Sequence, residues 1–85
     1  MIKHNYHKDL KSLCNNLGIK ILSLKEPEEI GLCVVNGVKY IILDKEFNEL
    51  TKAEHLAIAI SSIGIDNLYI PPYLREFIEI STRKN

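Results

Sequence analysis

The sequence predicts an α+β fold, in which three helices pack with a small antiparallel sheet of three strands in the order α-β-β-β-α-α. Three patterns indicate this fold: an amphipathic helical stripe near the N-terminus, an Asn-Gly turn between two apolar runs, and a long apolar helical segment after that turn. The chain has 85 residues, of which 46% are hydrophobic, and this is enough for one small core. We therefore expect residues 1–85 to form a single domain.

A first helix is predicted over residues 6–17, where apolar residues recur at helical spacing. Its stripe consists of Tyr6, Leu10, Leu13, Cys14 and Leu17. Asn5 is suited to capping the start of the helix, and Gly18 to the left-handed position just past its end. Residues 19–24 follow as a strand, and Pro27 together with the acidic residues around it interrupts the extended run.

Residues 31–43 contain the strongest local signal, Asn36-Gly37 between two apolar runs. A two-residue type I′ turn needs positive φ at both positions, so the two runs should form a hairpin with Val35 opposite Val38. One face of this hairpin should carry Leu32, Val34, Ile41 and Leu43, with Lys39 at its turn end. The other face should carry Cys33, Val35, Val38, Tyr40 and Ile42. Because both faces are largely apolar, we expect helices on one and partial cover, or a partner, on the other.

Residues 51–65, TKAEHLAIAISSIGI, predict a buried central helix. Thr51 and Glu54 match the S/T-x-x-E capping box at its start, and Gly64 is suited to ending it. The residues expected to form its contact with the sheet are Leu56, Ile60, Leu32, Ile41 and Leu43. A last helix should begin near Pro72, because proline fits the first helical turn. Its inner stripe should consist of Leu74, Phe77, Ile78 and Ser81.

The charge of the chain is balanced, with eleven basic and eleven acidic residues. A nucleic-acid binder usually has a basic excess, because lysine and arginine contact the phosphates. The distribution is uneven: residues 1–25 hold five lysines and one aspartate, whereas residues 26–54 hold seven acidic residues and three lysines. Solvated faces of an amphipathic fold explain this pattern better than a nucleic-acid site. Nucleic acid is thus disfavoured as a partner but stays an alternative.

Cysteine content and hydropathy bear on location. Cys14 and Cys33 are too few for a disulfide framework and lie among apolar residues, which indicates buried thiols in a reducing compartment. No stretch reaches the ~18 apolar residues of a membrane span, and the N-terminus lacks the apolar region of a signal peptide. We expect a cytoplasmic protein without membrane contact.

Motifs for catalysis, metal binding or cofactor binding are weak or missing. Glu54 and His55 are helical neighbours whose side chains point about 100° apart, so they cannot share a ligand. His4-x-x-His7 could chelate a metal if helical, but no cysteine or acid stands at metal-ligand spacing beside it. The four glycines are isolated, so there is no phosphate-binding loop. We expect no catalytic residue, no bound metal and no cofactor.

The candidate residues for contact with a partner lie in two places. They are Val35, Val38, Lys39, Tyr40, Ile42, Tyr69 and Tyr73. Within the hairpin, Tyr40 is expected to act as an anchor on the second face and Lys39 to lie at its rim. Tyr69 and Tyr73 flank two prolines, where rigid aromatic rings can form a binding ledge or close the edge of the core. Closure of the core is the preferred interpretation.

A family resemblance rests on element order and on two patterns in the sequence. The hairpin has the form G-L-C-x-x-x-G-x-x-x-I-I-L, and L-[ST]-x-x-E with an apolar helix follows it. Together with the preceding helix and strand, over roughly residues 10–65, this resembles the minimal core of the zincin-like metallopeptidases of the ImmA/IrrE type. Aligned on Leu50-Thr51, the family's H-E-x-x-H falls on Ser61, Ser62, Ile63, Gly64 and Ile65. The resemblance therefore implies a shortened relative without the catalytic histidines and glutamate, and no functional residue can be carried over.

Three functions follow as hypotheses. The first is a non-catalytic domain that acts by protein–protein interaction, including self-association. The second is a nucleic-acid-associated regulator that uses the basic N-terminal face. The third is a small metal-dependent hydrolase with a site at His4 and His7.

Overall fold

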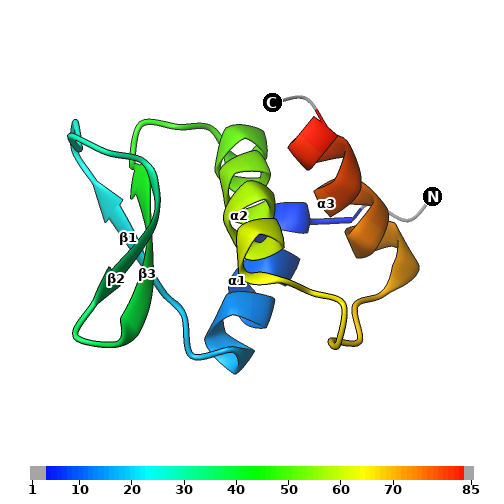
Figure 1. Cartoon of the computed structure of the whole chain (residues 1–85). Coiled ribbons are helices and arrows are strands. Elements are labelled where there is room, and N and C mark those ends of the chain that lie inside the picture. Colours follow the sequence, from blue (N-terminus) through cyan, green and yellow to red (C-terminus); the bar gives the residue numbers. More distant parts are fainter. Residues whose placement is uncertain (1–3, 84–85) are drawn as a thin grey trace.

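The computed structural model describes residues 4–83 and confirms the α+β fold and the predicted order of elements. The elements are α1 (Tyr6–Asn16), β1 (Lys20–Leu24), β2 (Gly31–Val35), β3 (Val38–Asp44), α2 (Glu49–Ile63) and α3 (Pro72–Arg83). The sheet lies at one end of the molecule, α1 and α2 lie against one of its faces, and α3 lies beyond α2 at the other end (Figure 1).

The sheet is mixed, so the expectation of an antiparallel sheet was wrong. Its strand order is β1-β3-β2, and β1 runs parallel to β3 with Ile21 opposite Ile41. The connection from β1 to β2 in residues 25–30 spans the width of two strand spacings, about 10 Å. This gap leaves room for β3, which becomes the central strand. The sequence shows the hairpin partner of β3 because that pairing is local, but the neighbour of β1 is chosen by contacts distant along the chain.

The β2–β3 hairpin is confirmed in its turn and in its register. Asn36 and Gly37 both have positive φ, 51° and 80°, as a type I′ turn requires. Val35 pairs with Val38, Cys33 with Tyr40, and Leu32 with Ile41. This register decides which side chains face the helices.

The core lies between the sheet and α2 and continues between α2 and the other two helices. Ile41 and Leu43 of β3 are fully buried, as are Leu56 and Ile60 of α2, which confirms the predicted centre. Leu32 and Val34 share the inner face but stay exposed to 38% and 58%, because β2 is an edge strand. The buried residues of α1 and α3 are Leu10, Cys14, Leu74, Ile78 and Ser81.

The helix ends follow the sequence signals with one correction. Asn5 caps α1 by accepting a hydrogen bond from the Lys8 N–H at 3.0 Å. The capping box predicted at Thr51 and Glu54 was wrong, because α2 begins at Glu49 and its cap is Asn48. The Asn48 side chain accepts a hydrogen bond from the Thr51 N–H at 2.8 Å. An asparagine just upstream provided a better acceptor than threonine, so the helix starts earlier than predicted.

No helix within residues 4–83 has the length and apolar character needed to cross a bilayer. The longest of them, α2, has 15 residues.

Candidate functional site

The main candidate site is the face of the sheet that points away from the helices. Side chains alternate between the two faces of each strand, so the pairings that put Ile41 inside put its sequence neighbours outside. We call this surface the outer face. Its apolar side chains are Leu22, Leu24, Cys33, Val35, Val38, Tyr40 and Ile42.

No helix of the described chain covers the outer face. All three helices lie on the opposite side of the sheet (Figure 1), and α1 packs against α2 and β1 there. The burial pattern along β3 agrees, since Ile41 and Leu43 are fully buried while Tyr40 and Ile42 stay partly exposed. Val35 is exposed to 49%. Of the two arrangements left open by the sequence, the one in which the first helix covers this face is not the one adopted.

The outer face is apolar in the middle and charged only at its ends. Lys20 lies at the start of β1 beside Tyr40, and Asp44 lies at the end of β3 beside Leu24. Between them the face carries no ionisable group besides the Cys33 thiol and the Tyr40 phenol. A contiguous apolar patch with a polar rim has the composition of a protein-binding surface.

Two residues of the outer face were not predicted from the sequence. Leu22 and Leu24 of β1 are exposed to 40% and 42% and extend the patch beyond the hairpin. Alternation with Ile21 and Ser23 was visible in the sequence and separates the two faces of β1. The parallel pairing with β3, which decides which face lies outside, was not visible.

The other predicted contact residues do not join the outer face. Lys39 lies on the inner side of the sheet at the turn end, opposite Val34, and borders an open hollow of about 380 Å³ together with Asp66. Tyr69 is 85% exposed and therefore does not close the core. Only Tyr73 among the two tyrosines packs against the core.

Tyr73 links α1 to α3 at the far end of the molecule. Its hydroxyl donates a hydrogen bond to the Asp9 carboxylate at 2.6 Å, and its ring stacks on His4 with centroids 3.9 Å apart. Beside this pair, the rings of Tyr6 and Phe77 stack at 4.1 Å. The hydrogen bond to Asp9, helped by burial, raises the pKa of the Tyr73 phenol. These contacts serve to dock α3.

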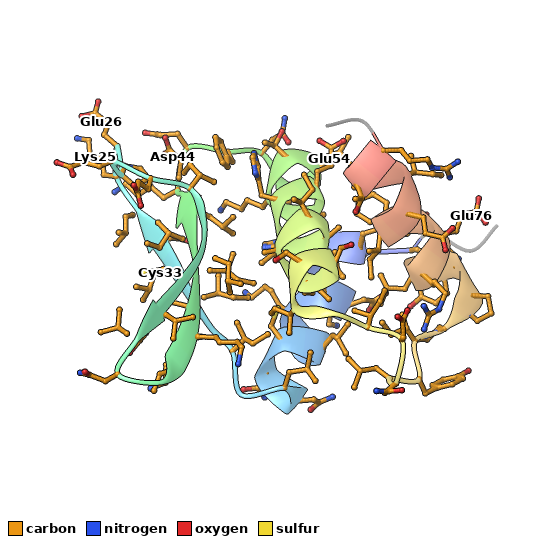
Figure 2. The ribbon with its side chains drawn as sticks, in the orientation of Figure 1. Lys25, Glu26, Cys33, Asp44, Glu54 and Glu76 are labelled. Carbon is orange, nitrogen blue, oxygen red and sulfur yellow. The ribbon has the colours of Figure 1, made fainter. Side chains whose placement is uncertain are left out.

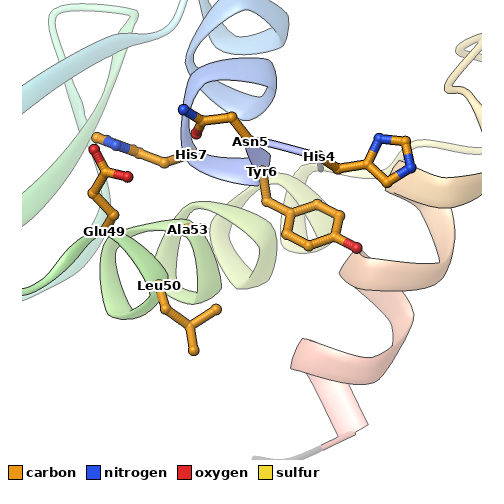
Figure 3. A pocket seen from close by; sticks show the side chains of 7 residues that line it. All are labelled: His4, Asn5, Tyr6, His7, Glu49, Leu50 and Ala53. Atoms are coloured by element: carbon orange, nitrogen blue, oxygen red, sulfur yellow. The ribbon is translucent and has the colours of Figure 1, made fainter. Parts of the chain in front are cut away.

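A second hollow, of about 540 Å³, lies at the N-terminal end of α1 (Figure 3). In it His7 lies beside Glu49, whereas His4 points the other way, toward α3. The two imidazoles therefore do not converge on one point. Burial, followed by the nearby Lys11 and Lys52 ammonium groups, lowers the pKa of His7. Within residues 4–83 no three side chains of the metal-binding types are grouped closely enough to hold an ion.

The remaining reactive side chains have structural surroundings. His55 stacks on Phe47 with centroids 5.0 Å apart. The Ser62 hydroxyl donates to the Ala59 carbonyl at 2.7 Å, which is the usual bond of a helical serine to the preceding turn. Cys14 is fully buried, and burial raises its pKa to about 11, so its thiolate is suppressed. None of these groups is arranged as an activated nucleophile.

The positions that align with the zincin-like motif lie at the end of α2. A metal-binding pair of histidines four residues apart needs an unbroken helix to share one face. Here α2 ends at Ile63, and Gly64 with φ of 99° terminates it. Ser61 is thus in the last helical turn, whereas Ile65 lies beyond the helix.

Comparisons of the chain with models of known protein families, with curated proteins and with solved structures give no match. The functional argument therefore rests on the geometry of the fold and its surfaces.

Proposed function

We propose that this chain is a non-catalytic domain that acts by binding protein through the outer face of its sheet. The observation that supports this proposal is the set of seven apolar side chains on a sheet face that no helix of residues 4–83 covers. Tyr40 lies in the central strand among them and is the expected anchor, because buried tyrosines contribute strongly to protein interfaces.

Hydrophobic burial supplies the driving force for such binding. Removing a half-exposed leucine or valine from water contributes roughly 1 kcal/mol, and Leu22, Leu24 and Val35 are exposed to 40%, 42% and 49%. The charged side chains of the face are Lys20 beside Tyr40 and Asp44 beside Leu24, and both lie at strand ends, so docking of the apolar side chains between them need not desolvate an ion. The hydrolase alternative has no comparable support, since the rings of His4 and His7 point apart.

The resemblance to zincin-like domains implies a chain that lacks their catalytic side chains, which agrees with a non-catalytic role. Ser61, Ser62 and Ile65 occupy the aligned positions of the catalytic side chains, and a zinc hydrolase needs three protein ligands and a base. A cytoplasmic location belongs to the same proposal.

The test compares Tyr40→Glu with Tyr69→Glu, the same change at an exposed tyrosine off the outer face. Each variant and the unchanged protein would be immobilised and incubated with purified candidate proteins, and binding measured by biolayer interferometry. We expect Tyr40→Glu to weaken binding at least tenfold and Tyr69→Glu to leave it unchanged. Thermal unfolding of all three proteins checks that the fold is kept.

Equal loss of binding in both variants would contradict the assignment of the outer face. Binding that is unchanged by Tyr40→Glu would contradict it as well.

A further inference from the structure

The strand β2 is one of the two edge strands of the sheet and, unlike β1 with its Lys20, carries no charged residue. It contacts only β3 and α2 among the elements and lies at the sheet edge. Natural edge strands are usually guarded by a charge, a proline or a bulge. Gly31–Val35 has no charge and no proline, and it pairs with β3 residue for residue without a bulge. The side chain of Val34, within this strand, is exposed to 58%.

The hairpin register decides which backbone groups of β2 are free to pair. In a two-residue hairpin the pair next to the turn, Val35 and Val38, exchanges both backbone hydrogen bonds, and bonded pairs then alternate. Cys33 and Gly31 therefore direct their backbone groups at β3. Leu32 and Val34 direct theirs away from the sheet.

We propose that two copies of the chain pair antiparallel through β2, forming a continuous six-stranded sheet with Cys33 of each copy opposite the other. This inference deepens the proposed function and rests on it, because it names a second copy as a partner of the same sheet. A two-fold axis at Cys33, the middle residue of the strand, is the only centre that pairs all five residues of β2. It places Leu32 of each copy opposite Val34 of the other copy. The backbone N–H and C=O groups that β2 directs away from β3 can then form hydrogen bonds between the two copies.

The charges at the two ends of the sheet favour the antiparallel arrangement. At one end lie Lys25, Glu26 and Asp44 (Figure 2), and Glu28, Glu29 and Lys45 belong to the same end, which therefore holds four acidic residues and two lysines. At the hairpin end lies Lys39, and residues 33–43 contain no acid. Antiparallel pairing brings the acidic end of one copy beside the basic turn of the other. Parallel pairing would bring the two acidic ends together.

The helices leave room for this dimer. α2 packs over both β2 and β3, so across the new sheet the two copies of α2 would be separated by about two strand spacings, or ~10 Å. That distance falls at the upper end of the usual 8–10 Å between packed helices. The outer faces of the two copies would lie on one side and form a single, doubled apolar surface.

The Cys33 thiol provides a direct test of the register. Opposed residues of a non-hydrogen-bonded antiparallel pair have Cα atoms ~4.5 Å apart, which is within the range that a disulfide bridges. Diamide accepts two electrons and two protons from a pair of thiols and leaves a disulfide. We expect the reduced protein at about 50 μM to form a covalent dimer on treatment with diamide, seen on a non-reducing gel. Cys14→Ala should cross-link equally, and Cys33→Ser should not.

A relocated thiol separates paired strands from random collision. Val35→Cys in the Cys33→Ser background places the thiol on the same outer face, at a more exposed position, but opposite Gly31 of the second copy. We expect it to cross-link at least tenfold more slowly than Cys33. Equal or faster cross-linking at position 35 would overturn the proposed register.

Sedimentation velocity tests the association without an oxidant. Val34→Pro removes a backbone N–H that points away from β3, so the hairpin keeps its bonds while pairing between copies is blocked. Val34→Lys places a charge at the same edge and serves as a second blocking variant if proline disturbs the fold. We expect the wild-type chain to dimerise at tens of micromolar and both variants to be monomers. A monomeric wild type at 100 μM would overturn this inference, while the Tyr40→Glu test with other proteins would still decide the proposed function.

Discussion

Leu56 and Leu50 show how strongly the effect of one residue depends on its position on a helix. Both lie on α2, yet Leu56 is fully buried under the sheet and Leu50 is exposed to 57%. Truncating a buried leucine removes its apolar contacts and leaves a cavity, whereas truncating an exposed one changes little. A leucine-to-alanine change therefore tests the core contact at Leu56 and serves as the control at Leu50.

We predict that Leu56→Ala, and likewise Ile60→Ala, lowers the free energy of unfolding by about 2–5 kcal/mol. Leu50→Ala should change it by about 0.5 kcal/mol or less. Urea unfolding followed by circular dichroism measures all three. A Leu56→Ala protein as stable as the Leu50→Ala protein would show that the core contact between α2 and the sheet is wrongly placed.

Gly37 is required for its backbone conformation and not for lack of space. A Cβ atom added there would meet nothing within 4 Å, but the residue has φ of 80°. We predict that Gly37→Val destabilises the protein by about 1–2 kcal/mol, because a β-branched residue resists the left-handed region. Gly37→Asn should be tolerated better, since asparagine accepts positive φ. Equal stability of the two variants in thermal unfolding would argue against the type I′ turn.

At the scale of elements, the sequence predicted what is decided locally. Asn36-Gly37 fixed the hairpin register because a turn constrains only its own neighbours. The helix start was misplaced at Thr51 because the sequence contained two competing caps, and Asn48 prevailed. The pairing of β1 with β3 joins residues about twenty positions apart, and no local propensity encodes it. Five of the seven apolar side chains of the outer face were thus predicted, and Leu22 and Leu24 were not.

The hydrogen bond from Tyr73 to Asp9 joins α3 to α1, beside the stacked rings of Tyr6 and Phe77. The pKa of Tyr73 is raised above its usual value of 10.0 by this bond first and by burial second. The native state therefore holds the phenolic proton more tightly than the unfolded chain. This stabilisation is complete below pH 10 and is lost as the pH rises above 10 through the native pKa.

We predict that Tyr73→Phe lowers the free energy of unfolding by about 1 kcal/mol at pH 8. The difference from the wild type should shrink as the pH rises above 10, because the wild type then loses its extra stability. Urea unfolding at a series of pH values measures this. Tyr69→Phe, at the exposed tyrosine, should leave the free energy unchanged throughout. Wild-type and Tyr73→Phe curves that stay parallel above pH 10 would contradict the role of the hydrogen bond.

At the scale of the whole molecule, the hydrophobic core and the exposed outer face of the sheet lie on opposite sides of the sheet. The helices and the inner face of the sheet share one core, and α3, which carries Tyr73, lies at the end farthest from the sheet (Figure 1). The outer face takes no part in this packing. Changes there can therefore alter binding while leaving the core intact, which is the condition that the Tyr40→Glu test requires.

We predict that the purified, tag-free protein binds no stoichiometric zinc at neutral pH and has no peptidase activity. The reason is the absence of H-E-x-x-H, with Ser61, Ser62 and Ile65 at the aligned positions. Elemental analysis and a casein cleavage assay measure the two properties. About one zinc per chain, lost in His4→Ala or His7→Ala, would favour the hydrolase hypothesis instead.

The central position of β3 also determines the order in which the sheet can form. During synthesis β1 and β2 emerge before β3, and neither has its native neighbour until residues 38–44 follow. Once the turn has formed, β2 and β3 can pair within about microseconds, because closing a two-residue loop costs little conformational entropy. β1 must then find the free side of β3 across a longer stretch of chain. A nascent chain that stops before Val38 would therefore hold two apolar segments without the strand that pairs with both of them.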